Sequence, residues 1–193
     1  MFGGFHFIKF SFYFQTFYSI LTYMDIFAHA AWTNIVFYKK YKKERLNRFL
    51  SVLFGLLPDF ASFSPIFIYG FFTSTKFFDL VGLDLWVVNF ANESYKYTHS
   101  IIIFALVALL IYFLRGRVWY WPMFGWALHI LIDIGTHKNF YETPFLFPIS
   151  DYKFGYGISW AHPTFMLLNY GLLAVFYICW FFVVRNRKTQ SSS

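Results

Sequence analysis

Imidazole and carboxylate side chains recur at helical spacing inside apolar stretches of this sequence. His129, Asp133 and His137 follow one another at intervals of four residues, and Asp25 and His29 are also four apart. Residues at this interval lie on one face of an α-helix. Imidazole and carboxylate groups are suitable ligands for zinc, iron or manganese. An isolated ionisable stripe along an apolar helix has few other uses, so residues 129–137 favour a metal site, with a proton relay or cation path as the main competitor.

Three more ionisable residues interrupt or border apolar runs. Asp59 follows Pro58, where a helix readily bends and where freed backbone groups must be satisfied in a protein-lined cavity. A charged group in lipid is costly, so each of these residues needs a partner or a cavity. The full set of predicted metal ligands is Asp25, His29, Asp59, His99, His129, Asp133, His137 and His162. For a single histidine the alternative is a hydrogen-bonded interior residue, which we adopt for His6 and leave open for His162.

Two carboxylates and two lysines follow the 129–137 stripe. Glu142 or Asp151 could act as a general base or an extra ligand, although for each of them an ordinary solvated loop carboxylate is the favoured interpretation. Lys138 and Lys153 could steer a phosphate anion toward the site. The single cysteine, Cys179, permits no internal disulfide and no cysteine-type zinc site.

The elements that carry these residues are strongly apolar. Of the 193 residues 59% are hydrophobic and only 13% are charged, and Phe alone occurs 30 times. A soluble domain of this size has no interior large enough to hide that much apolar surface. The composition therefore predicts a single membrane domain over residues 1–193, embedded in a lipid bilayer.

Apolar runs of the required length predict an all-α integral membrane bundle of about five transmembrane helices. Four of the apolar runs are close to the ~20 residues that a helix needs to cross a bilayer. A fifth run forms a first helix that ends at Tyr38. The four spans are 49–72, 97–114, 118–137 and 162–184. Residues 1–23 are a possible N-terminal extension, since Met24 could be an internal start, and a cleaved signal is the alternative. Residues 189–193 are predicted to be a disordered tail.

The distribution of charge predicts how these helices are oriented. Most of the formal charge of +7 lies in three basic clusters, 39–48, 115–117 and 185–188, each next to an apolar segment. Basic loops remain cytoplasmic, so these clusters indicate membrane topology, and no nucleic-acid partner is expected. The loops 73–96 and 138–161 then lie outside. Counting along the helices from the basic clusters places the predicted ligands in the outer half of the membrane.

The order of five short motifs resembles a known family. The segments MDIFAHAAW, GLLPDF, YTHS, HILIDIGTH and PFLFPIS, within residues 24–165, resemble the membrane-bound metal-dependent hydrolases known as LexA-binding, inner-membrane-associated hydrolases. That group is distantly similar to zinc-dependent phospholipase C and single-strand nucleases, an all-helical superfamily with a metal cluster. The matching positions are His29, Asp59, His99, His129, Asp133, His137 and His162. Met166 replaces a final acidic ligand and Asp25 would replace the amino-terminal one, so the resemblance implies one or two metal ions.

The resemblance implies a multi-pass protein of the cell's inner membrane with a divalent metal, zinc, in a site toward the outer face. The expected reaction is hydrolysis of a phosphoester in a lipid-like substrate by metal-activated water. Asp59, His99, His129 and Asp133 would be the core ligands. Asp59 and Glu142 are the candidates for a catalytic role. The alternative is a proton or metal-ion transporter that uses the same cluster, which the few ionisable residues in the inner half of the spans disfavour.

The predicted orientation is testable by labelling. Cysteines introduced as Asp79→Cys and Asp151→Cys should react with a membrane-impermeant reagent in intact cells, because both loops are expected outside. Labelling of both positions only after permeabilisation would reverse the orientation and move the site to the inner face.

Overall fold

The computed structural model describes residues 26–138, 141–160 and 162–190, and every regular element in these ranges is a helix. The all-α prediction is therefore confirmed for the described residues. Asp25, His6, the possible extension 1–23 and residues 191–193 lie outside the described residues. The elements are α2 (Ile26–Tyr38), α3 (Arg45–Thr73), α4 (Phe77–Val81), α5 (Trp86–Thr98), α6 (Ile101–Leu114), the 3-10 helix η1 (Trp121–Met123), α7 (Phe124–Thr136) and α8 (Pro163–Gln190).

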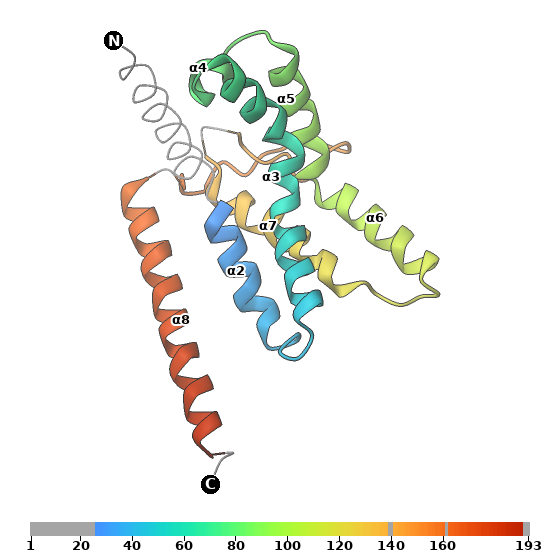
Figure 1. The fold of residues 1–193 in the computed structure, drawn as a ribbon. Helices are drawn as coiled ribbons and strands as arrows, with labels where there is room; N and C mark the ends of the chain where they lie inside the picture. Colours follow the sequence, from blue (N-terminus) through green and yellow to red (C-terminus); the bar gives the residue numbers. More distant parts are fainter. Residues whose placement is uncertain (1–25, 139–140, 161, 191–193) are drawn as a thin grey trace, which may run out of the picture.

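Helix α3 is the centre of the bundle. Helices α2, α5 and α7 each pack extensively along it, and α8 packs against α2 at the periphery (Figure 1). Helices α2 and α8 run down the view, and α3 and α7 run up (Figure 1). The α2–α3 loop, the α6–η1 loop and the C-terminal end of α8 lie in the lower half of that view, and α4 lies at the top.

Two helices of the described chain are long and apolar enough to cross a membrane by themselves. They are α3, and α8 over Pro163–Phe182. Helices α5 and α6 pass the same test only when taken together, and they bend by 63° at the break between them. The described parts of α2 and α7 have 13 residues each, fewer than the ~20 of a complete span. The structure thus supports a helical bundle with two or three spanning helices, and does not show five.

Local backbone chemistry explains why two predicted spans are shorter than expected. Ser100 is extended, and its hydroxyl accepts hydrogen bonds from the N–H groups of Ile102 and Ile103, which caps α6 and separates it from α5. The predicted span 97–114 therefore begins at Ile101. Pro122 lies in η1, so the predicted span 118–137 becomes a 3-10 turn followed by the shorter α7.

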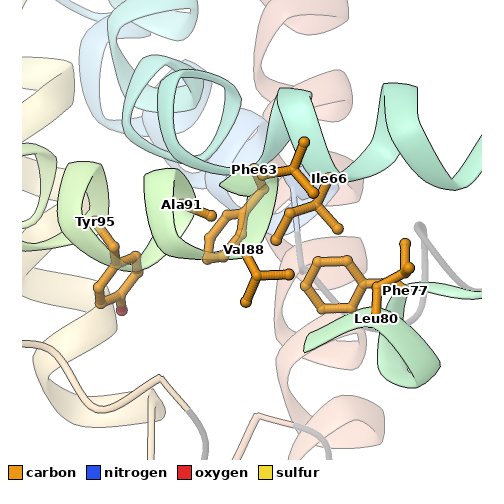
Figure 2. Close-up of a cluster of buried hydrophobic side chains, with 8 residues drawn as sticks. Phe63, Ile66, Phe77, Leu80, Val88, Ala91 and Tyr95 are labelled. Carbon is orange, nitrogen blue, oxygen red and sulfur yellow. The ribbon is translucent and has the colours of Figure 1, made fainter. Parts of the chain in front are cut away.

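Two clusters of buried apolar side chains hold α5 and α7 in place. Figure 2 shows the first, which joins α3, α4 and α5. Its members are Phe63, Ile66, Phe77, Leu80, Val87, Val88, Ala91 and Tyr95. The second joins α6 to η1 and α7 through Phe104, Ala108, Met123, Trp126 and Ile130. The break between α5 and α6 thus has packed side chains on both sides of it.

Small residues let α3 approach both α2 and α7 closely. A Cβ added at Gly125 in α7 would lie 2.1 Å from the carbonyl oxygen of Ser51, and one added at Gly55 would lie 2.5 Å from Oγ1 of Thr33. Such contacts between small residues are the usual way in which membrane helices pack backbone to backbone. They fix the distance of α2 and α7 from α3, and hence the positions of the polar residues on those helices.

This contact predicts the effect of one added methyl group. Gly125→Ala should lower the free energy of unfolding by about 1–3 kcal/mol, the usual cost of overpacking, because the methyl group would meet the α3 backbone. The measurement is the melting temperature in detergent. Gly135→Ala in the same helix is the matched control, since a Cβ there meets nothing within 4 Å. Equal melting temperatures for the two variants would contradict the proposed close packing.

Candidate metal centre

Four buried residues from three parts of the bundle meet at one point. Asp59 comes from α3, His99 from the break between α5 and α6, and His129 and Asp133 from α7. One ligand atom from each lies within 4.8 Å of the ligand atoms of the other three. His99, His129 and Asp133 have no exposed surface, and Asp59 is 5% exposed. A metal ion could therefore be held here entirely by protein ligands.

The two imidazoles face each other across the centre of this group. Nε2 of His99 lies 3.1 Å from Nε2 of His129. Oδ2 of Asp133 is 3.2 Å from the first nitrogen and 3.0 Å from the second. Oδ1 of Asp59 is farther away, at 3.5 Å from Nε2 of His99 and 3.6 Å from Nε2 of His129. All four side chains thus direct nitrogen or oxygen atoms toward the same small volume.

Each imidazole is held by hydrogen bonds on its far side. Nδ1 of His129 lies 2.7 Å from the carbonyl oxygen of Gly55, and Nδ1 of His99 lies 3.2 Å from that of Tyr95 and 2.9 Å from the Thr98 hydroxyl. A carbonyl oxygen only accepts, so Nδ1 of His129 carries a proton and donates it. The Nε2 atoms of both rings face the centre. This arrangement, in which the outer nitrogen donates to a backbone carbonyl, is typical of metal-bound histidine.

The chemistry of the donor set fits a cation. With an ion bound, both rings would be neutral, and two nitrogen lone pairs and the carboxylate oxygens would converge on it. Both oxygens of Asp133 are buried without a hydrogen bond of acceptable geometry. A proton shared between the two imidazoles would bond only to their two Nε2 atoms. A divalent ion would attract these nitrogens and the oxygens of Asp59 and Asp133 together. The described residues therefore fit a bound metal ion better than a neutral hydrogen-bonded network.

Two further histidines contact the other oxygen of Asp133. Oδ1 lies 3.1 Å from Nε2 of His29 in α2 and 3.3 Å from Nδ1 of His137, which follows α7. The His29 ring also stacks on that of His129, with centroids 4.0 Å apart. Each carboxylate oxygen of Asp133 thus faces its own pair of imidazoles. Asp133 could therefore bridge two metal ions. It could equally bind one ion through Oδ2 while His29 and His137 hydrogen-bond to Oδ1.

The predicted ligands differ in where the structure places them. Those that it brings together around Asp133 are His29, Asp59, His99, His129 and His137. His162 is exposed at the residue before α8, and no described contact links it to the others. Asp25 lies outside the described residues. The i, i+4, i+8 pattern of residues 129–137 holds in space, although α7 itself ends at Thr136.

Glu142 and Asp151 do not join the buried cluster. They line an open pocket of about 590 Å³ between α5 and the segment after α7, which we call the outer pocket. Its lining residues are Asn92, Tyr95, Lys96, Tyr141, Glu142, Pro144, Asp151 and Lys153. The outer pocket borders the metal centre through Tyr95, whose ring stacks on that of His99 with centroids 3.8 Å apart.

Hydrogen bonds tie the segment after α7 to the helices around the cluster. The Tyr95 hydroxyl donates to the carbonyl oxygen of Tyr141 at 2.7 Å, and the N–H of Ile101 donates to that of Phe145 at 2.9 Å. The Tyr141 hydroxyl donates to Oδ1 of Asn92 at 2.8 Å. Burial raises the pKa of Tyr141 to about 12, so this donor keeps its proton at neutral pH. The segment therefore forms a fixed wall beside the break between α5 and α6.

The residues that orient the imidazoles are absent from the sequence-based prediction. Gly55, Tyr95 and Thr98 all act on the outer nitrogens, and Thr98 Oγ1 lies 2.9 Å from Nδ1 of His99. Helical spacing offered a signal for two of them. Gly55 precedes Asp59 by four residues, and Tyr95 precedes His99 by four, so each shares a helix face with a predicted ligand.

Comparison with known proteins returned no match, whether to protein-family models, to curated proteins or to solved structures. The resemblance to the membrane-bound hydrolases therefore stays a prediction.

The geometry predicts which substitutions remove the metal. His129→Ala and Asp133→Ala should each lower the metal content of the purified protein and its melting temperature. Metal bound only by the folded state stabilises it by linkage, by about 4.1 kcal/mol when the free metal is 1,000-fold above its Kd. The measurements are elemental analysis and thermal unfolding in detergent.

His162→Ala is the matched control, because this exposed histidine should change neither quantity. Wild-type protein that is purified without chelator and holds no stoichiometric transition metal would contradict the assignment.

Proposed function

We propose that this chain is a membrane-embedded, metal-dependent hydrolase that acts on a phosphoester of a lipid-like substrate. The observation that supports it most directly is the convergence of two imidazoles on buried carboxylates. Asp59, His99, His129 and Asp133 would hold a divalent ion, for which zinc is our choice. His29 and His137 would hold a second ion or orient Asp133.

The bound metal would acidify a water molecule to hydroxide and polarise the scissile group. The protein's own residues then have separate tasks. His99 and His129 are held rigidly by their outer hydrogen bonds, so they fix the position of the ion. Asp59 lies farther from both imidazoles than Asp133 does, and it keeps some exposed surface. Asp59 is therefore the residue that we assign to accept a proton from the attacking water.

Three observations favour a phosphoester over other hydrolysable groups. The ligand order resembles that of the phospholipase C superfamily. Lys153, which is exposed beside the cluster in a lining that also holds Lys96, Glu142 and Asp151, would face an anionic group. Water is the expected nucleophile, because the cluster consists of imidazoles and carboxylates and the single cysteine, Cys179, is exposed on α8. We therefore assign a phosphodiesterase or phosphatase reaction.

The membrane setting favours a lipid substrate. Helices α3 and α8 are apolar enough to span a bilayer, and most of the α8 surface over Pro163–Phe182 is exposed, as expected for a helix that faces lipid. The basic α2–α3 and α6–η1 loops lie toward the end of the bundle opposite α4 (Figure 1). If these basic loops lie in the cytoplasm, the outer pocket would open at the outer face of the inner membrane.

The rival function, transport of protons or metal ions, needs a polar path from the cluster to the cytoplasmic loops. Tight contacts occupy that direction in the described residues. Thr33 meets Gly55, and Ser51 meets Gly125, at distances that leave no room for an added Cβ. We therefore favour an enzyme over a channel, on the basis of a buried cluster that lies next to the outer pocket and has closely packed helices on its other side.

The proposal predicts a metal-dependent reaction on lipid phosphates. Protein in mixed micelles should release a phosphorylated head group or phosphate from a phospholipid. Chelator and Asp59→Asn should each abolish the activity. The rate should rise with pH through the pKa of metal-bound water, near ~7 in zinc sites, because only the hydroxide attacks.

Asp84→Asn is the control, since this exposed loop carboxylate bonds only to Asn89 among its described contacts and should leave the rate unchanged. If metal-loaded protein hydrolyses no phosphoester but moves a cation or proton across sealed vesicles, the transporter function replaces the hydrolase.

A further inference from the structure

We propose that Thr98 and Ser62 are positioning residues for the metal centre. The Thr98 hydroxyl orients the His99 ring, and Ser62 acts through Thr98 from the neighbouring helix. Oγ of Ser62 lies 2.8 Å from Oγ1 of Thr98, which lies 2.9 Å from Nδ1 of His99. We call these two side chains the hydroxyl relay. Its role rests on the metal site of the proposed function and does not depend on the reaction assigned to that site.

The Ser62 side chain differs from the other hydroxyls of α3 in where it bonds. Those of Ser51, Ser64 and Thr73 each donate to the carbonyl oxygen four residues earlier in the same helix, a common arrangement for serine and threonine within helices. Ser62 has no exposed surface, and its described hydrogen bond crosses to α5, which packs beside α3 (Figure 1). The Ser62 hydroxyl therefore links α3 to the end of α5, directly before the ligand at the break.

The count of donors and acceptors gives the relay a direction. The Thr98 hydroxyl has one hydrogen and two lone pairs, and it lies 3.0 Å from the carbonyl oxygen of Ser94, which only accepts. If Thr98 donates to Ser94, its lone pairs can accept from Ser62 and from Nδ1 of His99. Nδ1–H also lies near the carbonyl oxygen of Tyr95, at 3.2 Å. If Thr98 donated to Nδ1 instead, both carbonyl oxygens would face lone pairs.

The favoured direction leaves the His99 ring ready for a metal ion. With the proton on Nδ1, a neutral ring has an unprotonated Nε2, as a metal ligand requires. That atom lies on the cluster side, 3.1 Å from Nε2 of His129. In this arrangement the Thr98 hydroxyl donates one hydrogen bond and accepts two, so it has no freedom to rotate. Without Ser62 one lone pair would be left empty, and the hydroxyl would hold the ring less firmly.

Helix α3 reaches both nitrogens of the His99 ring. Asp59 lies three residues before Ser62 on α3, and its Oδ1 is 3.5 Å from Nε2 of His99. Ser62 reaches Nδ1 through Thr98. Trp126 of α7 also donates its ring N–H to the carbonyl oxygen of Thr98. Thr98 is thus tied to α3 through its side chain and to α7 through its backbone.

The test measures the zinc affinity of the full-length protein in detergent by competition with a chromophoric chelator. Thr98→Val, which replaces the hydroxyl with a methyl group, should weaken zinc binding by about 10–100-fold. Thr98→Ser keeps the hydroxyl and should bind zinc as wild type does. Ser62→Ala should weaken binding by about fivefold, the effect of one ordinary hydrogen bond. Ser64→Ala is the matched control and should change nothing, because this hydroxyl bonds within its own helix.

A double substitution distinguishes the relay from a general loss of stability. Because Ser62 acts through Thr98, Ser62→Ala should add no further loss of zinc affinity in the Thr98→Val background. Additive losses would show that the two hydroxyls act separately and would overturn the relay. The melting temperature of the metal-free protein is measured for each variant. Losses of zinc affinity that merely follow a lower melting temperature, in Thr98→Ser as well, would also overturn it.

The outcomes separate the relay from the proposed function. Unchanged zinc affinity in Thr98→Val and Ser62→Ala would overturn the relay and leave the hydrolase intact. If Thr98→Val does not fold, equal affinity of Ser62→Ala and Ser64→Ala would overturn the relay by itself. Wild type that binds zinc but hydrolyses no phosphoester would contradict the reaction, while the expected order of the variants would still support the relay. Wild type that binds no zinc would overturn both.

Discussion

The arrangement of the bundle depends on the burial of one carboxylate. Asp133 has no exposed surface, and its two oxygens contact four imidazoles, two on each side. A buried carboxylate is tolerated only when positive charge and well-placed partners compensate for its lost hydration. Those partners come from α2, from the α5–α6 break and from α7 itself. Three separate parts of the chain must therefore meet at the middle of α7, and the small residues along α3 make that approach possible.

The break between α5 and α6 follows from the same requirement. In a continuous helix His99 would be one of many side chains around an apolar cylinder, whereas the 63° bend turns the chain at His99 itself. A break exposes backbone groups that lipid cannot satisfy. Here Ser100 caps α6, its hydroxyl donates to the carbonyl oxygen of Phe147, and the N–H of Ile101 donates to Phe145. The segment after α7 thus satisfies the break and encloses the cluster.

The sequence was sufficient for features that depend on local periodicity. The i, i+4 interval places His129 and Asp133 on one helix face whatever surrounds them, and the long apolar runs predict the all-α bundle that the described residues form. Features set by contacts between distant segments were not predictable. The carbonyl of Gly55 that orients His129 and the exposed position of His162 depend on how α3, α7 and α8 pack. Hydropathy measures how apolar a run is, and it does not show where the helix within that run begins.

One helix links the outer pocket to the buried cluster. Tyr95 packs its ring against His99, donates its hydroxyl proton to the segment after α7, and lines the outer pocket. Because α5 is fixed to α3 by the apolar cluster, Tyr95 cannot move away from His99 without disturbing that packing. The position of His99 therefore depends on the same side chain that forms part of the pocket wall.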